Sequence, residues 1–118
     1  MNGAIIGLGH GHRVISKAFE IENINLIGVY SKNLQNTLEY SKKYNLKKIY
    51  KSVDDLINDQ DVELVAIAVP AYYQLELLKK CLKNNKKIFC EKPITVNYDH
   101  LKRLFNKINK FRNKLIVD

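Results

Sequence analysis

A glycine-rich turn near the amino end contains residue types that bind phosphate. Gly7 and Gly9 follow the short apolar run at residues 4–6 in the spacing G-x-G. Glycine at such a turn permits a positive φ and lets a pyrophosphate approach the backbone N–H groups. A helix that begins directly after the turn would point its positive end at the same anion. The segment therefore predicts a dinucleotide-binding turn, made by Gly7, Leu8, Gly9, His10, Gly11 and His12.

One position departs from the strict G-x-G-x-x-G fingerprint, because His12 stands where Gly or Ala is usual. Its bulk is expected either to push the first helix outward, with the pocket adjusting, or to reduce dinucleotide affinity. His10 and His12 also suggest a metal site at first sight. A pair two residues apart, with no nearby carboxylate or thiolate, is not a typical ligand set, so we expect no metal.

The end of the second predicted strand bears on the choice of cofactor. An Asp or Glu at this point would accept both ribose hydroxyls and favour NAD, but the sequence has Ser31 and Lys32. A hydroxyl and an ammonium suit a 2′-phosphate by hydrogen bonding and charge, which favours NADP over NAD. The alternative is that Ser31 merely begins a turn and Lys32 is a solvated side chain, which leaves the cofactor open.

Secondary-structure elements must position these residues. Along the whole chain, the hydrophobic pattern alternates between segments typical of strands and segments typical of helices. Such alternation, without hairpin signals, predicts an α/β fold with a Rossmann-type, doubly wound parallel sheet in the strand order 3-2-1-4-5-6. The apolar run at residues 64–69, which Pro70 stops, is expected to be central and covered on both faces. Strands are expected near residues 4–6, 26–30, 49–50, 64–69, 86–90 and 115–117, and helices near residues 13–21, 34–44, 52–57, 72–84 and 97–108.

Length and composition limit the possible classes of protein. The 118 residues suffice for one domain, expected at 1–118, but not for a second substrate domain. The net charge of +8 comes mostly from scattered lysines, which indicate a solvated surface and no nucleic-acid partner. No apolar run approaches the ~20 residues that span a bilayer, and no leader pattern opens the chain, so we expect a cytoplasmic protein without membrane contact. Cys81 and Cys90 are expected to be reduced and inert.

Two further motifs carry a resemblance to a known family. Pro70-Ala71-Tyr72-Tyr73-Gln74 follows the central strand, and Phe89-Cys90-Glu91-Lys92-Pro93 ends the next one. In both places, and along essentially its whole length, the chain resembles the glucose-fructose oxidoreductase, inositol dehydrogenase and MocA family. In that family a strand ending in Pro and a following Glu-Lys-Pro both occur. The resemblance implies hydride transfer between a nicotinamide cofactor, NAD or NADP, and the carbinol carbon of a sugar, polyol or sugar derivative.

The resemblance also implies roles for particular residues. The glycine turn would hold the pyrophosphate, and Ser31 would meet the adenosine ribose. Val69 and Pro70 would lie beside the nicotinamide half, and Lys92, oriented by Glu91, would reach the nicotinamide region and the substrate. The Lys92 ammonium could then stabilise the negative charge that develops on a substrate hydroxyl as hydride departs, which makes Lys92 the expected catalytic residue.

The chain departs from the family in two ways. Gln74 stands where many members carry a histidine, so a contact on the nicotinamide or substrate side is expected to change. The family also places its acid-base histidine and its association surface in a second α+β domain, which is expected to be absent here, and His100 is not placed to substitute. A homo-oligomer and a sugar-like substrate would depend on that domain.

Three functions are therefore compared. The favoured one is the nucleotide-binding domain of an NAD(P)-dependent oxidoreductase that needs a partner domain for catalysis. The alternative is a stand-alone dinucleotide-binding or regulatory module without catalysis. A methyltransferase is disfavoured, because Ile5 and Ser31 occupy positions where such enzymes place acidic residues.

Overall fold

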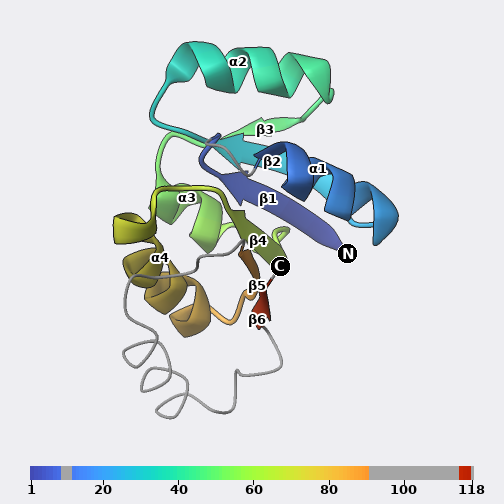
Figure 1. Ribbon diagram of the computed structural model, residues 1–118. Coiled ribbons are helices and arrows are strands. Elements are labelled where there is room, and N and C mark those ends of the chain that lie inside the picture. The colour runs from blue at the N-terminus through green and yellow to red at the C-terminus, as the bar shows by residue number, and fades with distance from the viewer. Residues whose placement is uncertain (9–11, 91–114, 118) are drawn as a thin grey trace.

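The computed structural model describes residues 1–8, 12–90 and 115–117. Within them, a parallel sheet of six strands has the order β3-β2-β1-β4-β5-β6 (Figure 1). This confirms the predicted doubly wound topology. The helix expected at residues 97–108 lies outside the described residues. The elements are β1 (Asn2–Ile6), α1 (His12–Ile21), β2 (Asn25–Tyr30), α2 (Leu34–Lys43), β3 (Lys48–Ile49), α3 (Val53–Asn58), β4 (Leu64–Ile67), α4 (Ala71–Lys83), β5 (Lys87–Cys90) and β6 (Leu115–Val117).

The core forms two layers, one on each face of the sheet. Successive strand residues point to opposite faces, so Ala4 and Ile6 enter one cluster and Ile5 enters the other. The first cluster contains apolar residues of α3 and α4, and the second contains residues of α1 and α2. Every residue of β4 is buried, which confirms the prediction that this strand is central and covered on both faces.

The helix ends follow from local sequence. Asn33 caps α2 by accepting a hydrogen bond from the Asn36 N–H at 3.0 Å, and Ser52 caps α3 by accepting one from the Asp55 N–H at 3.0 Å. A short polar side chain at the N-cap satisfies an amide that the helix leaves unpaired. Past the carboxyl ends of α1, α2 and α4, an asparagine takes a positive φ, as asparagine does more readily than most residues. These are Asn23, Asn45 and Asn85, with φ of 57°, 53° and 65°.

Cys81 is buried in α4 among the core residues that cover the sheet, so it packs there as predicted. In the described part of the chain, the helices are all too short or too polar to cross a membrane.

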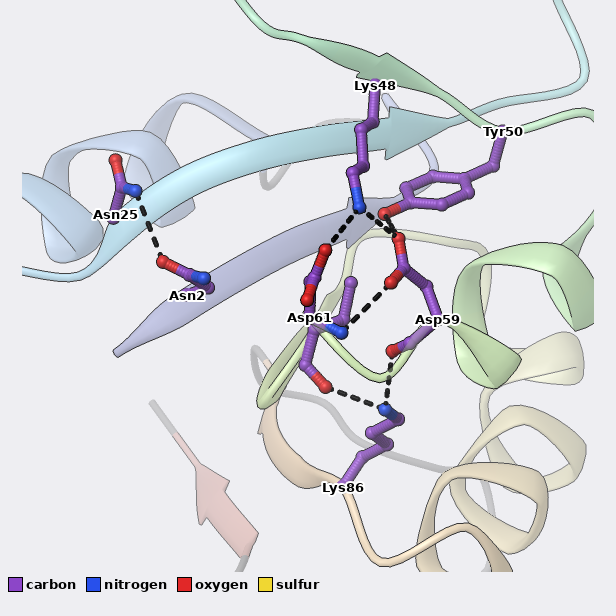
Figure 2. Close-up of polar contacts among 8 residues, drawn as sticks. Asn2, Asn25, Lys48, Tyr50, Asp59, Asp61 and Lys86 are labelled. Carbon is purple, nitrogen blue, oxygen red and sulfur yellow. Dashed lines mark hydrogen bonds and ion pairs between the residues drawn. The ribbon is translucent and has the colours of Figure 1, made fainter.

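A polar network joins the loops at the amino edge of the sheet (Figure 2). Lys48, at the start of β3, donates to a carboxylate oxygen of Asp59 at 2.7 Å and of Asp61 at 2.9 Å. Tyr50 donates its hydroxyl to the same Asp59 carboxylate at 2.7 Å. Lys86, which precedes β5, is buried and donates to the Asp59 carbonyl at 2.9 Å and the Val62 carbonyl at 2.6 Å. The acidic turn before β4 therefore ties together residues at both ends of the short strand β3 and the residue that precedes β5.

This network predicts a loss of stability in acid. Hydrogen bonds from Lys48 and Tyr50 lower the pKa of Asp59 from its ordinary 3.8 to about 2. The stabilisation is complete above the ordinary pKa and is lost as the pH falls from about 4 through about 2. Solvent screens the pair, so we expect a loss of roughly 1 kcal/mol. Urea unfolding at several pH values should show a steeper acid decline for the natural chain than for Asp59→Asn, and parallel curves would contradict the assignment.

Candidate functional site

A cavity of about 480 Å³ opens at the carboxyl edge of the sheet. Residues at or just past the ends of β1, β2 and β4 line it, together with the first turns of α4. In a sheet of this topology, ligands bind in the crevice outside the carboxyl ends of the strands, where the strand order reverses. Apolar side chains at the cavity are Ile6, Leu8, Val53, Ala68, Val69, Pro70 and Leu77, and polar ones are Tyr30, Ser31, Lys32, Asn33, Asn36, Tyr72, Tyr73, Glu76 and Lys80.

Gly7 lies where the cavity meets the end of β1. Its φ is +88°, and its N–H donates to the Tyr30 carbonyl at 2.7 Å. A Cβ at this position would lie 2.6 Å from the Ala68 carbonyl oxygen and 2.7 Å from Val69 Cγ1. Only glycine allows the chain to turn here so close to the backbone that follows β4. The predicted need for a positive φ is therefore met at Gly7, and Leu8, half-buried, follows it along the cavity wall.

The remaining residues of the turn are only partly visible. Gly9, His10 and Gly11 lie outside the described residues, and His12 is the first residue of α1, with its side chain not described. The close approach of α1 to the sheet occurs at Gly3, which the sequence did not single out. A Cβ there would lie 2.7 Å from the Phe19 ring.

Ser31 lies at the wall of the cavity, where β2 passes into α2. Its hydroxyl donates to the Asn33 carbonyl at 3.1 Å and lies 2.7 Å from the Thr37 hydroxyl. Ser31 therefore does shape the turn, as the alternative interpretation proposed, and it also lines the cavity. Because a serine hydroxyl has one proton, which Ser31 gives to the Asn33 carbonyl, the side chain keeps acceptor capacity for a donor such as a ribose hydroxyl.

Lys32 reaches a residue on another element. Its Nζ donates to the Tyr73 hydroxyl at 2.8 Å and lies 4.2 Å from the centre of the Tyr73 ring. The Tyr73 hydroxyl, as acceptor, raises the pKa of Lys32, so the side chain stays cationic at neutral pH. Lys32 is exposed, as the alternative interpretation expected, and it also contacts Tyr73. No role was assigned to Tyr73 from the sequence, although Tyr73 lies in the segment noted after the central strand, and the cavity-lining carboxylate of Glu76 was missed.

The segment after β4 brings backbone to the cavity. The strand ends at Ile67, two residues earlier than predicted, and Val69 and Pro70 then lead into α4 along the cavity wall. Gln74 is buried, and its amide lies 3.4 Å from the Val69 carbonyl as a donor. Gln74 therefore stabilises the backbone between β4 and α4 through this hydrogen bond, a role that the sequence did not predict.

The predicted catalytic segment lies beyond the described sheet. Glu91, Lys92 and His100 lie outside the described residues. β5, which leads toward Lys92, is parallel to β4 with Cys90 opposite Ile67, so it ends at the same edge as the cavity. Across the part of the chain that is described, no three side chains of metal-binding type come together.

Comparison with known proteins gives the same assignment as the geometry. The model of the Gfo/Idh/MocA oxidoreductases, described as an oxidoreductase family with an NAD-binding Rossmann fold, matches residues 1–118. The myo-inositol 2-dehydrogenase of Thermotoga maritima is 27% identical over 111 residues, which are 93% of this chain and 33% of that protein. An uncharacterised oxidoreductase of Synechocystis is 26% identical over 116 residues, covering 98% of this chain and 31% of that protein.

Two solved structures are similar as well. A proposed NADPH-dependent oxidoreductase from Desulfitobacterium hafniense has a TM-score of 0.85 and 31% identity, over 98% of this chain and 34% of that one. An NAD-binding protein from Listeria innocua has a TM-score of 0.84 and 29% identity, over 98% of this chain and 34% of that one. The chain thus spans about a third of the length of these relatives. It belongs to the Gfo/Idh/MocA oxidoreductase family and has that family's NAD-binding Rossmann fold.

Proposed function

We propose that residues 1–118 form one NAD(P)-binding domain of an oxidoreductase that transfers hydride between nicotinamide and a sugar, polyol or sugar derivative. The observation that carries the proposal is Gly7, which has a φ of +88° at a cavity of about 480 Å³ beside the end of β1. A backbone without a Cβ at this point suits close contact with a pyrophosphate. The substrate class is supported by the name of the myo-inositol 2-dehydrogenase relative. A cytoplasmic location remains a prediction from the sequence.

In this proposal, different residues along the cavity contact different parts of the dinucleotide and the substrate. The turn Gly7, Leu8, Gly9, His10, Gly11 and His12 would hold the pyrophosphate with its N–H groups. Ser31 and Lys32 would contact the adenosine ribose, and Val69 and Pro70 would lie beside the nicotinamide half. Lys92, with Glu91 orienting it, would hydrogen-bond the reacting substrate hydroxyl. When bound, the nicotinamide supplies the hydride acceptor or donor for the reaction.

We propose further that the site favours NADP over NAD. Ser31 and Lys32 stand where a carboxylate would bind the ribose hydroxyls of NAD. The Lys32 ammonium faces the cavity through its contact with Tyr73, so a cation is available for a 2′-phosphate. One opposing charge is present, because Glu76 also lines the cavity.

Calorimetric titration of this chain with NAD and with NADP tests the proposal. Lys32→Ala is expected to weaken NADP binding about 10-fold and to leave NAD binding nearly unchanged, since a hydrogen bond to a charged group is lost. Lys80→Ala is the matched control. It removes the same charge from the cavity wall, but that lysine is paired with Asp54 at 3.2 Å. An NADP preference that persists in Lys32→Ala would contradict the assignment of Lys32.

A further inference from the structure

The contact between Lys32 and Tyr73 joins two sides of the cavity. Lys32 follows β2, whereas Tyr73 lies in the first turn of α4, after β4. In the sheet, β1 lies between these two strands and ends at Ile6, directly before Gly7. All three residues line the same cavity, so the contact bridges it near the end of β1. A lysine and a tyrosine 41 positions apart are thus held together where the adenosine end of a dinucleotide is proposed to bind.

Tyr73 holds the ammonium in two ways. Its hydroxyl accepts a hydrogen bond from Lys32 Nζ at 2.8 Å, and its ring lies 4.2 Å from the same nitrogen. The Tyr73 ring packs against Tyr72, with 4.4 Å between the ring centres. Tyr73 is the less exposed of the two, at 37% against 74%. The flexible lysine side chain is therefore held by a tyrosine whose ring also contacts Tyr72.

We propose that Tyr73 is a positioning residue for a 2′-phosphate, and that it sets the preference for NADP by holding Lys32 in place. This inference rests on the proposed function. An ammonium has three donors, so one can remain on Tyr73 while the others bind phosphate oxygens.

Glu76 is a second group that could attract the Lys32 ammonium, so Tyr73 also affects where that charge lies. Glu76 lies one helical turn beyond Tyr73 on α4 and lines the same cavity. A lysine released from Tyr73 would be attracted to this carboxylate, and pairing with it would reduce the positive charge offered to a phosphate. Tyr73 thus holds the Lys32 ammonium at the first turn of α4, in competition with Glu76.

The experiment compares Tyr73→Phe with the natural chain in four titrations: NADP, NAD, 2′,5′-ADP and 5′-AMP. Phenylalanine keeps the ring and removes only the hydroxyl, so NADP and 2′,5′-ADP are expected to bind about 3- to 10-fold more weakly. NAD and 5′-AMP, which lack the 2′-phosphate, are expected to bind as before. Tyr73→Leu, which removes the ring as well, should give a larger loss with the same selectivity. Tyr72→Phe is the control and should change none of the four.

A double substitution separates positioning from structural support. In a Lys32→Ala background, Tyr73→Phe is expected to cause no further loss of NADP affinity, because the residue acts through Lys32. Equal weakening of NAD and NADP, additive losses in the double variant, unchanged binding in Tyr73→Phe, or tighter NADP binding would each overturn the inference. A natural chain that binds neither dinucleotide would instead overturn the proposed function and this inference with it. Thermal melting shows that the variants are folded before they are compared.

Discussion

Gly7→Ala is expected to raise the dissociation constant for either dinucleotide at least about 100-fold and to destabilise the fold by roughly 2 to 4 kcal/mol. The residue has a φ of +88°, where a side chain is strained, and its Cβ would lie 2.6 Å from the Ala68 carbonyl oxygen. That oxygen belongs to the backbone between β4 and Pro70, which cannot rotate away as a side chain could. The end of β1 and the segment after β4 must therefore separate, and both line the cavity.

Titration calorimetry and urea unfolding measure the two effects. Asn45→Ala is the matched control, because Asn45 also has a positive φ, at 53°, but is exposed beyond the end of α2 and away from the cavity. Alanine there should cost about 1 kcal/mol of stability and leave dinucleotide binding unchanged. If Gly7→Ala bound NADP as tightly as the natural chain, the turn would not hold the pyrophosphate, and the proposed function would lose its main support.

The arrangement of the sheet was predictable because short segments of the sequence identify its strands and helices. Alternating apolar runs and helical stripes identify the strands and helices, and the rule for right-handed crossovers then leaves few arrangements. The helix expected near residues 52–57 was predictable because its cap is local: the Ser52 side chain accepts from an amide only three residues away. The same reasoning placed β4 at the centre, since a run of apolar residues without polar alternation needs cover on both faces.

The missed contacts are those between residues far apart in the sequence. The Lys32 and Tyr73 pair depends on where β2 and α4 meet above β1, and no spacing in the chain reveals it. The acidic residues Asp59 and Asp61 can be read from the sequence, but their pairing with Lys48 and Tyr50 required the structure. Gln74 was compared with a histidine of the family, and the structure instead gives it a place in the support of the turn after β4.

These omissions share a physical cause. A polar side chain on a helix or loop has several partners within reach, and their energies differ by about 1 kcal/mol, which is less than a sequence pattern can resolve. The free energy gained by burying apolar side chains sums over many residues, so it determines the arrangement of the sheet more strongly than single polar contacts do. The sequence was therefore informative about where a ligand could bind and much less informative about which side chains hold Lys32 there.

Lys92→Ala is the second substitution with a large expected effect, and it acts on catalysis alone. We expect turnover to fall about 10²- to 10⁴-fold, because the variant lacks the ammonium that we propose to hydrogen-bond the reacting hydroxyl. Dinucleotide affinity should change little. β5, which precedes this residue in the sequence, ends beside β4 at the same edge as the cavity.

The measurement follows the absorbance of reduced nicotinamide with a panel of sugars and polyols, using this chain together with a separately expressed C-terminal partner. Lys87→Ala supplies the control: it removes the same charge from the other end of β5, where that lysine is exposed at the amino edge of the sheet. Unchanged turnover in Lys92→Ala would refute its catalytic role. Binding of NADP without turnover in any combination would instead favour a stand-alone binding module, because the described cavity accounts for dinucleotide binding without requiring hydride transfer.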